Sequence, residues 1–160
     1  MRVAVPEVHI EIVDRPRLRV AAVRHIGSYS KISDAFTQLG ELAASADLAL
    51  LTAQMIAVYH DDPSTTPEAE LRSDAGLVID DGSPIPSTLV EVIVPAGRYA
   101  QTIHKGSYKG LAETWKQLLE QSLPSSGYRM ATSASYELYL NDPRQAPEDQ
   151  LRTAIYAPVH

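Results

Sequence analysis

Cysteine is absent from this chain of 160 residues, and its absence excludes several kinds of chemistry. The protein can have no disulfide framework, no thiolate nucleophile and no cysteine-based zinc site. Long apolar runs are absent as well: nowhere do 18 apolar residues follow one another, and the N-terminal stretch lacks the apolar core of a signal peptide. We therefore expect a cytoplasmic protein that does not enter the membrane.

Basic clusters are also missing. The net charge is −6 and lysine and arginine form no block, so the chain lacks the kind of surface that binds nucleic-acid phosphates. It has no phosphate-binding loop and no dinucleotide fingerprint. We expect no cofactor and no direct contact with nucleic acid. "HDD" at His60–Asp62 resembles a metal-binding run, but a turn in which aspartate accepts backbone hydrogen bonds explains it better.

What the chain does contain is a repeat. "HIGSY" at residues 25–29 returns as "HKGSY" at 104–108, and "YHDDP" at 59–63 returns as "YLNDP" at 139–143. The offset is 79 residues for the first pair and 80 for the second, so one inserted residue reconciles them. We interpret the pattern as an internal duplication. The prediction is a single domain over residues 1–160, with pseudo-repeats at about 8–79 and 90–157.

Hydrophobic periodicity predicts the elements of each half. Apolar residues at helical spacing predict one helix after Ser28 and another after Ser107, each serine acting as a cap. Apolar, often alternating, segments predict about eight strands: Val8–Val13, Leu18–Ile26, Met55–His60, Ala75–Ile79, Leu89–Val94, Arg98–His104, Tyr136–Leu140 and Thr153–Ala157. These elements indicate an α+β fold with a mostly antiparallel sheet. Two halves related by a pseudo-two-fold axis would leave a central cleft where they meet.

The positions at which the halves differ indicate where a function could lie. Tyr59 aligns with Tyr139, but Ala57 aligns with Glu137. Residues two apart in a strand share a face, so Glu137 and Tyr139 point the same way. Glu137 is then either a solvated strand residue paired with a basic side chain or a carboxylate among aromatic rings, which suits an organic cation. Eight tyrosines against one phenylalanine favour the cleft, because tyrosine joins a flat apolar ring to a polar tip.

Four segments that cover nearly the whole chain resemble the GyrI-like small-molecule-binding domain family. They read "RVAAVRHIGSY", "IAVYHDDPSTTPEAELRSDAGLVI", "GRYAQTIHKGSYKGLAETWKQLLEQSLPSSGY" and "SYELYLNDPRQAPEDQLRTAIYAPV". That family includes the DNA gyrase inhibitory protein and the effector-binding domains of multidrug-sensing regulators. The resemblance implies two β-α-β-β modules around a central cleft.

The resemblance also implies site residues. Glu137 would face the ligand, and the aromatic wall would come from Trp115, Tyr108, Tyr59 and Tyr139. For Trp115 a core position is an equal alternative, because its counterpart Phe36 lies on the inward face of the first helix.

Three functions follow from these observations. The first is a stand-alone protein that binds amphipathic cationic or planar aromatic compounds, since only a few residues precede Val8 and no helix-turn-helix is attached. The second is an inhibitor that acts on DNA gyrase by protein–protein contact. The third is a cofactor-free hydrolase of cyclopropane-bearing DNA-alkylating toxins, in which Glu137 would position or deprotonate water. Glu137 has no second acid, metal ligand or nucleophile beside it in the pattern, which favours binding over catalysis.

Overall fold

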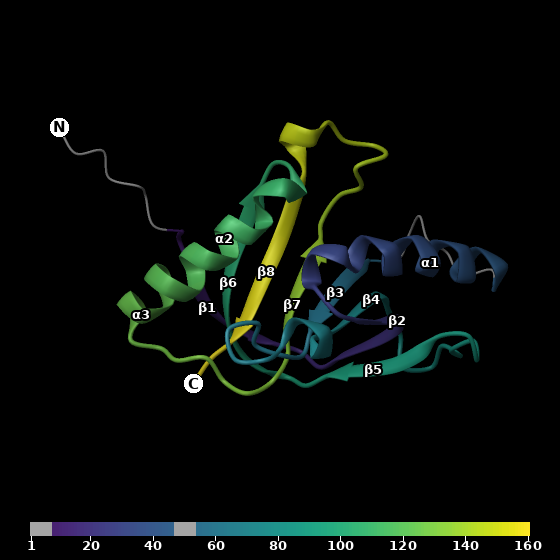
Figure 1. Ribbon diagram of the computed structural model, residues 1–160, viewed down its shortest axis with the longest axis horizontal. Coiled ribbons are helices and arrows are strands. Elements are labelled where there is room, and N and C mark those ends of the chain that lie inside the picture. The colour runs from purple at the N-terminus through teal and green to yellow at the C-terminus, as the bar shows by residue number, and fades with distance from the viewer. Residues whose placement is uncertain (1–7, 47–53) are drawn as a thin grey trace.

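The computed structural model describes residues 8–46 and 54–160, which form an eight-stranded sheet with the helices over one of its faces (Figure 1). The strand order is β1-β6-β8-β7-β3-β4-β2-β5, and every pairing is antiparallel. The strands are β1 (Glu11–Arg15), β2 (Leu18–Ile26), β3 (Met55–Tyr59), β4 (Arg72–Ile79), β5 (Val90–Val94), β6 (Gly97–Lys105), β7 (Ser135–Tyr139) and β8 (Arg152–Pro158). The predicted α+β class with an antiparallel sheet is confirmed.

The first strand begins and ends later than the prediction of Val8–Val13. β1 pairs with β6 from Glu11 opposite Gln101 to Arg15 opposite Gly97, so the extent of the partner strand fixes its ends. Arg15 stays in the strand because its guanidinium lies over the ring of Tyr156, 4.5 Å from the centroid. The chain therefore turns after Arg15 and enters β2 at Leu18.

The first helix is α1 (Ile32–Ser45), and a 3-10 turn at Tyr29–Lys31 leads into it. Ser28 caps this turn, its side-chain oxygen accepting a hydrogen bond from the Ser30 N–H. The predicted serine cap is therefore present, but it serves the 3-10 turn and not the α-helix itself.

The second helix departs from the regular helix that the pattern predicts. α2 (Leu111–Gln117) continues through a π-helical turn (Leu118–Ser122) into α3 (Leu123–Ser126). Pro124 explains the change, because it has no N–H for the carbonyl four residues earlier and its ring would crowd that carbonyl in a regular helix. None of the helices in the described part of the chain is long and apolar enough to cross a membrane.

Each helix buries one face against the sheet. Leu39 of α1 is fully buried in a cluster with Ala21 of β2 and Leu77 of β4. Leu118 packs in the same way against Ile155 of β8. Burying a large apolar side chain contributes about 1.5–3 kcal/mol, so these contacts fix the helices over the two halves of the sheet.

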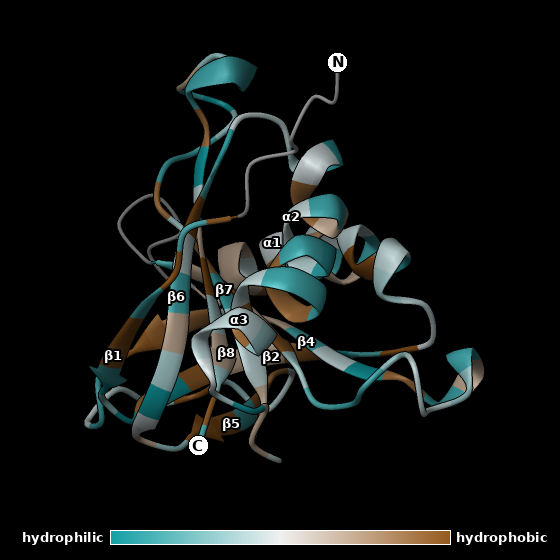
Figure 2. Ribbon diagram, turned by 90° about the vertical axis from the view of Figure 1, so that its left-hand side faces the viewer, coloured by the Kyte–Doolittle hydropathy of each residue, from teal (hydrophilic) through white to brown (hydrophobic). Residues whose placement is uncertain are grey.

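The opposite face of the sheet holds a second core that is rich in tyrosine. Tyr99, Tyr136 and Tyr156 are almost completely buried there, at 1%, 0% and 5% exposure. Figure 2 shows hydrophobic segments along the strands of the sheet, including β1 and β5. Burial raises the pKa of Tyr136 to about 12, and its hydroxyl accepts a hydrogen bond of 2.9 Å from Arg15 Nε. The prediction that the tyrosine excess serves a cleft is therefore wrong for these three residues, because alternation along each strand turns them away from the helices.

The strand registers recur between the two halves of the chain. Ala57 of β3 lies directly opposite Glu137 of β7, and these are the residues that the sequence repeat aligns at an offset of 80. His25 pairs with Ser73 in β2 and β4, just as His104 pairs with Thr153 in β6 and β8. An axis that relates the halves would pass through the pair of Ala57 and Glu137 at the centre of the sheet.

The edge strands are exchanged between the halves. β1 precedes the first helix in the chain but pairs with β6 of the second half, while β5 follows the first half and pairs back onto β2. The loop between β4 and β5 is held by Arg19, whose Nη1 donates to the carbonyl oxygens of Asp80 and Ser83. The continuous sheet therefore joins the two halves at its centre and at both edges.

Candidate functional site

Glu137 lies in the central strand β7, on the face that the helices cover. Only 3% of its surface is exposed. One carboxylate oxygen accepts a hydrogen bond of 2.5 Å from Trp115 Nε1, and the other accepts one of 2.9 Å from the Tyr139 hydroxyl. The side chain of Tyr59 also hydrogen-bonds to this carboxylate. The carboxylate is thus buried and held by donors from α2, β7 and β3, which excludes the alternative of a solvated strand residue.

The electrostatics of this group follow from its burial. Burial raises the pKa of Glu137 above the ordinary value, although hydrogen bonds from Trp115, Tyr139 and Tyr59 act in the opposite direction. Burial and the nearby carboxylate also raise the pKa values of Tyr59 and Tyr139 well above the ordinary tyrosine value. Both hydroxyls therefore remain protonated and available as donors to the carboxylate.

Two groups of aromatic rings flank Glu137. In one group the rings of Tyr29 and Tyr59 lie 4.8 Å apart, and that of Trp115 lies 6.2 Å from Tyr59. The other group repeats this plan with different residues. There the ring of Tyr139 lies 5.4 Å from that of Tyr108 and 5.6 Å from that of Phe36. Each group combines a turn tyrosine, a strand tyrosine and an aromatic residue from the helix of the other half.

These rings line a cavity of about 1960 Å³ between the helices and the centre of the sheet. Ligand pockets commonly measure about 300–1,000 Å³, so this cavity is large. Among the described residues that line it, Glu137 is the buried charged group, whereas the other charged side chains are half-buried or exposed. Those are His60, Asp61, Asp62, Lys116, Glu120, Asp142 and Arg144.

All five residues that the sequence singled out line this cavity: Tyr59, Tyr108, Trp115, Glu137 and Tyr139. Trp115 meets both expectations, because its ring packs against the cluster of Leu118 and Ile155 while its N–H reaches the carboxylate.

Two wall residues were missed by the sequence reasoning, Tyr29 and Phe36. The repeat contained the signal for both. Tyr29 occupies the place of Tyr108 in the first copy of the motif, and Phe36 occupies the place of Trp115.

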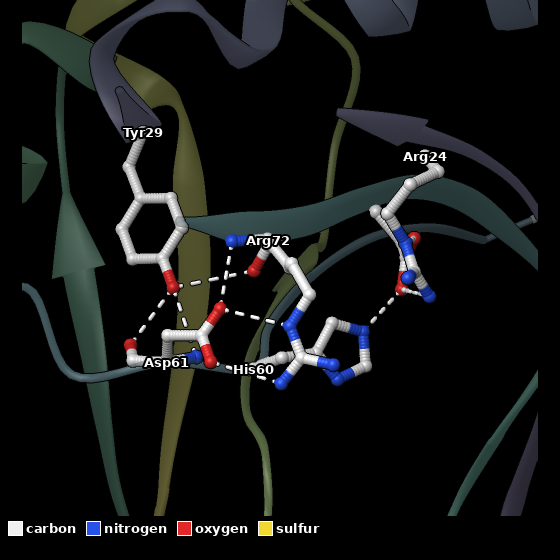
Figure 3. A network of polar contacts seen from close by, with 6 residues as sticks. Arg24, Tyr29, His60, Asp61 and Arg72 are labelled. Atoms are coloured by element: carbon white, nitrogen blue, oxygen red, sulfur yellow. Dashed lines mark hydrogen bonds and ion pairs between the residues drawn. The ribbon is translucent and has the colours of Figure 1, made fainter. Parts of the chain in front are cut away.

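The "HDD" run forms a turn. Asp62 Oδ1 accepts a hydrogen bond of 2.8 Å from the Ser64 N–H, and Asp61 Oδ2 accepts one of 2.8 Å from the Arg72 N–H. Tyr29 ties this turn to the first helix, since its hydroxyl donates to the Asp61 carbonyl oxygen at 2.8 Å (Figure 3). Across residues 8–46 and 54–160, no three histidine, aspartate or glutamate side chains gather where they could hold a metal ion.

A buried ionic triad lies beside this turn. Asp74 is completely buried and accepts hydrogen bonds from Arg24 and His60 (Figure 3). Burial acts to raise the pKa of Asp74, but the hydrogen bonds from His60 and Arg24 outweigh it, so the pKa lies below the ordinary value. The triad joins β2, β4 and the residue that follows β3.

The histidines of the repeated motif have a structural part. His25 Nε2 lies 2.9 Å from the Ser28 carbonyl oxygen, and His104 Nε2 lies 2.8 Å from that of Ser107. Between the histidine and the serine of each motif, the glycine has a positive φ angle, 122° at Gly27 and 105° at Gly106, which glycine tolerates without strain. These contacts fix the turn that delivers Tyr29 and Tyr108 to the cavity.

Comparison with known proteins identifies the family. The model of the GyrI-like small molecule binding domain matches residues 9–160. The chain belongs to the GyrI-like family. As a GyrI-like protein it carries a small-molecule-binding domain. The aromatic cavity lies within the residues that the family model matches.

A GyrI-like relative and two solved structures illustrate the similarity. A DNA gyrase inhibitor of Yersinia enterocolitica is 34% identical over 139 residues, which cover 84% of this chain and 87% of that protein. The C-terminal domain of EcmrR superposes with a TM-score of 0.77 at 20% identity, over 96% of this chain and 98% of that one. A protein solved with bound tetraphenylphosphonium superposes with a TM-score of 0.71 at 12% identity, over 95% and 94%. At these identities the two structures show a shared fold.

Proposed function

We propose that this GyrI-like protein binds amphipathic organic cations in the aromatic cavity, with Glu137 as the counter-charge. The observation that carries the proposal is a carboxylate, 3% exposed, between two groups of aromatic rings. A cation in such a place gains charge pairing with the carboxylate and cation–π attraction from the ring faces. The neighbour with bound tetraphenylphosphonium supports this ligand class.

A buried charge is costly unless it has a purpose or a partner. Burying an ionised carboxylate without compensation is strongly unfavourable, and the donors around Glu137 offset only part of that cost, since its pKa remains raised. Ala57, the residue directly opposite in β3, shows that this position accepts a small apolar side chain. A function in cation binding explains why a carboxylate stands at one of these two places.

The test is the conservative variant Glu137→Gln, which keeps the shape and removes the charge. We expect affinity for tetraphenylphosphonium to fall at least about tenfold, or roughly 1.4 kcal/mol. Affinity for neutral triphenylphosphine oxide should change little. Both can be measured by titration calorimetry, with Glu113→Gln on the exposed side of α2 as a control. Equal losses for the two compounds would assign Glu137 a purely architectural part, and unchanged affinity for both would remove it from the site.

The relatives favour a second candidate function. The proteins named DNA gyrase inhibitor include the Yersinia protein, which is similar over most of its length. Inhibition of gyrase through protein–protein contact is therefore the second candidate function. Purified gyrase should lose supercoiling activity as this protein is added, and unchanged supercoiling at excess protein would exclude it.

Hydrolysis of alkylating toxins has less support. The side chains that hydrogen-bond to Glu137 include Trp115 and Tyr139, which supply neither a second carboxylic acid nor a metal ligand beside it. Mass spectrometry of the recovered compound distinguishes the two functions, because binding returns it unchanged and hydrolysis adds water.

We also infer that residues 1–160 form one domain built by internal duplication, with repeats at about 8–79 and 90–157. The recurring strand registers support this, and so does the exchange of edge strands, which gives each half a strand from the other. Residues 1–7 and 47–53 lie outside the described structure and do not contribute to this inference.

A further inference from the structure

The two helices present unequal walls to the cavity. Both α1 and α2 turn one face toward it, and the repeat aligns Phe36 with Trp115 and Gly40 with Leu119. At both aligned positions α1 carries the smaller residue. The first helix therefore presents smaller side chains to the cavity at these two positions.

Gly40 is unusual for a position inside a helix. It lies in the ninth position of the 14-residue helix α1, where glycine is less favourable than alanine by about 1 kcal/mol. Its backbone is helical, so no positive φ angle requires a glycine. Apart from its two neighbours in the chain and the adjacent helix backbone, no atom of the described residues lies within 4 Å of the place that a Cβ would take. Neither backbone conformation nor close packing within the described structure explains this glycine.

Its counterpart in the π-helical turn after α2 shows what another residue would do at this place. Leu119 also lines the cavity, and 38% of its surface is exposed. A leucine at position 40 would extend into the cavity in the corresponding way. The glycine thus keeps open a space that the second half fills.

We propose that the space over Gly40 is a ligand subsite, which receives an elongated apolar arm of the bound cation. The inference rests on the proposed binding of organic cations at Glu137. It adds that the protein selects cations whose apolar arm extends past Phe36 to reach Gly40.

Contacts along the wall of the cavity define the path of this arm. Glu137 contacts the Tyr139 hydroxyl, and the ring of Tyr139 lies 5.6 Å from that of Phe36. Gly40 follows Phe36 by four residues, about 6 Å farther along the helix axis. Met55 of β3 lines the same cavity, and its flexible thioether can adapt to different apolar groups. The arm is therefore apolar and longer than a single ring.

Two cations that differ by one ring test the subsite, benzyltriphenylphosphonium and (biphenyl-4-ylmethyl)triphenylphosphonium. For the wild-type protein we expect the biphenyl compound to bind at least about tenfold more tightly. In Gly40→Leu this gain should disappear, while affinity for the benzyl compound remains within about twofold. The variant should fold, because leucine is a better helix former than glycine and its Cβ has room.

Gln38→Leu is the matched control, since it adds leucine to an exposed position of the same helix that does not line the cavity. It should keep the full gain. If neither cation binds the wild type, the proposed function itself is wrong. If both bind but the biphenyl compound shows no gain, or Gly40→Leu keeps the gain, cation binding stands and the subsite over Gly40 is wrong.

Discussion

The ionisation of Glu137 affects the stability of the fold and the binding of a cation in opposite directions. A carboxylate attracts a cation only while it is ionised, but burial favours its protonated form and raises the pKa. Because the folded-state pKa lies above the unfolded value, protonation of Glu137 stabilises the fold. That stabilisation is complete below the unfolded pKa and is lost as pH rises through the raised folded pKa.

Cation binding should follow the reverse course. Affinity for tetraphenylphosphonium is expected to be constant at high pH and to fall as pH decreases through the raised pKa of Glu137. Well below that pKa the loss should approach about tenfold per pH unit. Titrations from pH 8 to pH 4 would measure it. In Glu137→Gln the profile should be flat, and an identical slope in this variant would assign the dependence to another group.

For single residues, the sequence predicted much of the candidate site because the two copies of the repeat can be compared with each other. The alignment of Ala57 with Glu137 singled out the strand of the candidate site, and the shared face of Glu137 and Tyr139 followed from strand alternation. The hydrogen bond from Trp115 to Glu137 could not be predicted, since it depends on how α2 is placed over β7. Helix periodicity shows that a residue faces inward, but not which strand residue it meets.

At the scale of the elements, the two halves also differ in how their strands are joined. The triad of Arg24, His60 and Asp74 links the strands of the first half. The repeat aligns these residues with Ile103, Leu140 and Ala154 in turn, so the second half carries apolar residues at the corresponding positions. Ala154 is buried and lies opposite Ile103 in the sheet, whereas Ile103 and Leu140 are 38% and 48% exposed. The second half therefore does without the ionic contact at these positions.

This alignment supplies a stability experiment. Asp74→Ala alone should lower the free energy of unfolding by about 2 kcal/mol, because Arg24 and His60 lose a charged hydrogen-bond partner. The triple variant that copies Ile103, Leu140 and Ala154 should recover most of that loss, since apolar replacements of buried ion pairs are often neutral or stabilising. Urea unfolding at pH 7 measures both. If the triple variant is less stable than Asp74→Ala, the aligned positions are not equivalent in packing.

The elements themselves were predicted better than their irregularities. Strand positions followed from alternation, whereas the π-helical turn before Pro124 did not. The periodicity of apolar residues continues through that turn, so only the proline pointed to an irregularity. The exchange of β1 and β5 was also not predictable, because alternation identifies a strand but not its partner.

For the whole molecule, charge argues against nucleic-acid binding. The net charge is −6 and lysine and arginine form no block in the sequence, so we expect few contacts that could release counterions from a phosphate backbone. We expect no measurable affinity for duplex DNA at moderate salt, even at micromolar protein. Fluorescence anisotropy with a labelled duplex would test this. Binding that weakens as salt is added would contradict the expectation.

Ala57 and Glu137 lie opposite each other at the centre of the sheet, and this pair limits the kinds of assembly in which such a site could form. A homodimer assembled from two identical halves would place the same residue on both sides of its axis. Two glutamates would then face each other at about 5 Å and repel, whereas two alanines would offer no charge. A single chain carries Ala57 on one side and Glu137 on the other. A single chain thus permits one unopposed charge between two neighbouring central strands, which no symmetric assembly of identical subunits could hold.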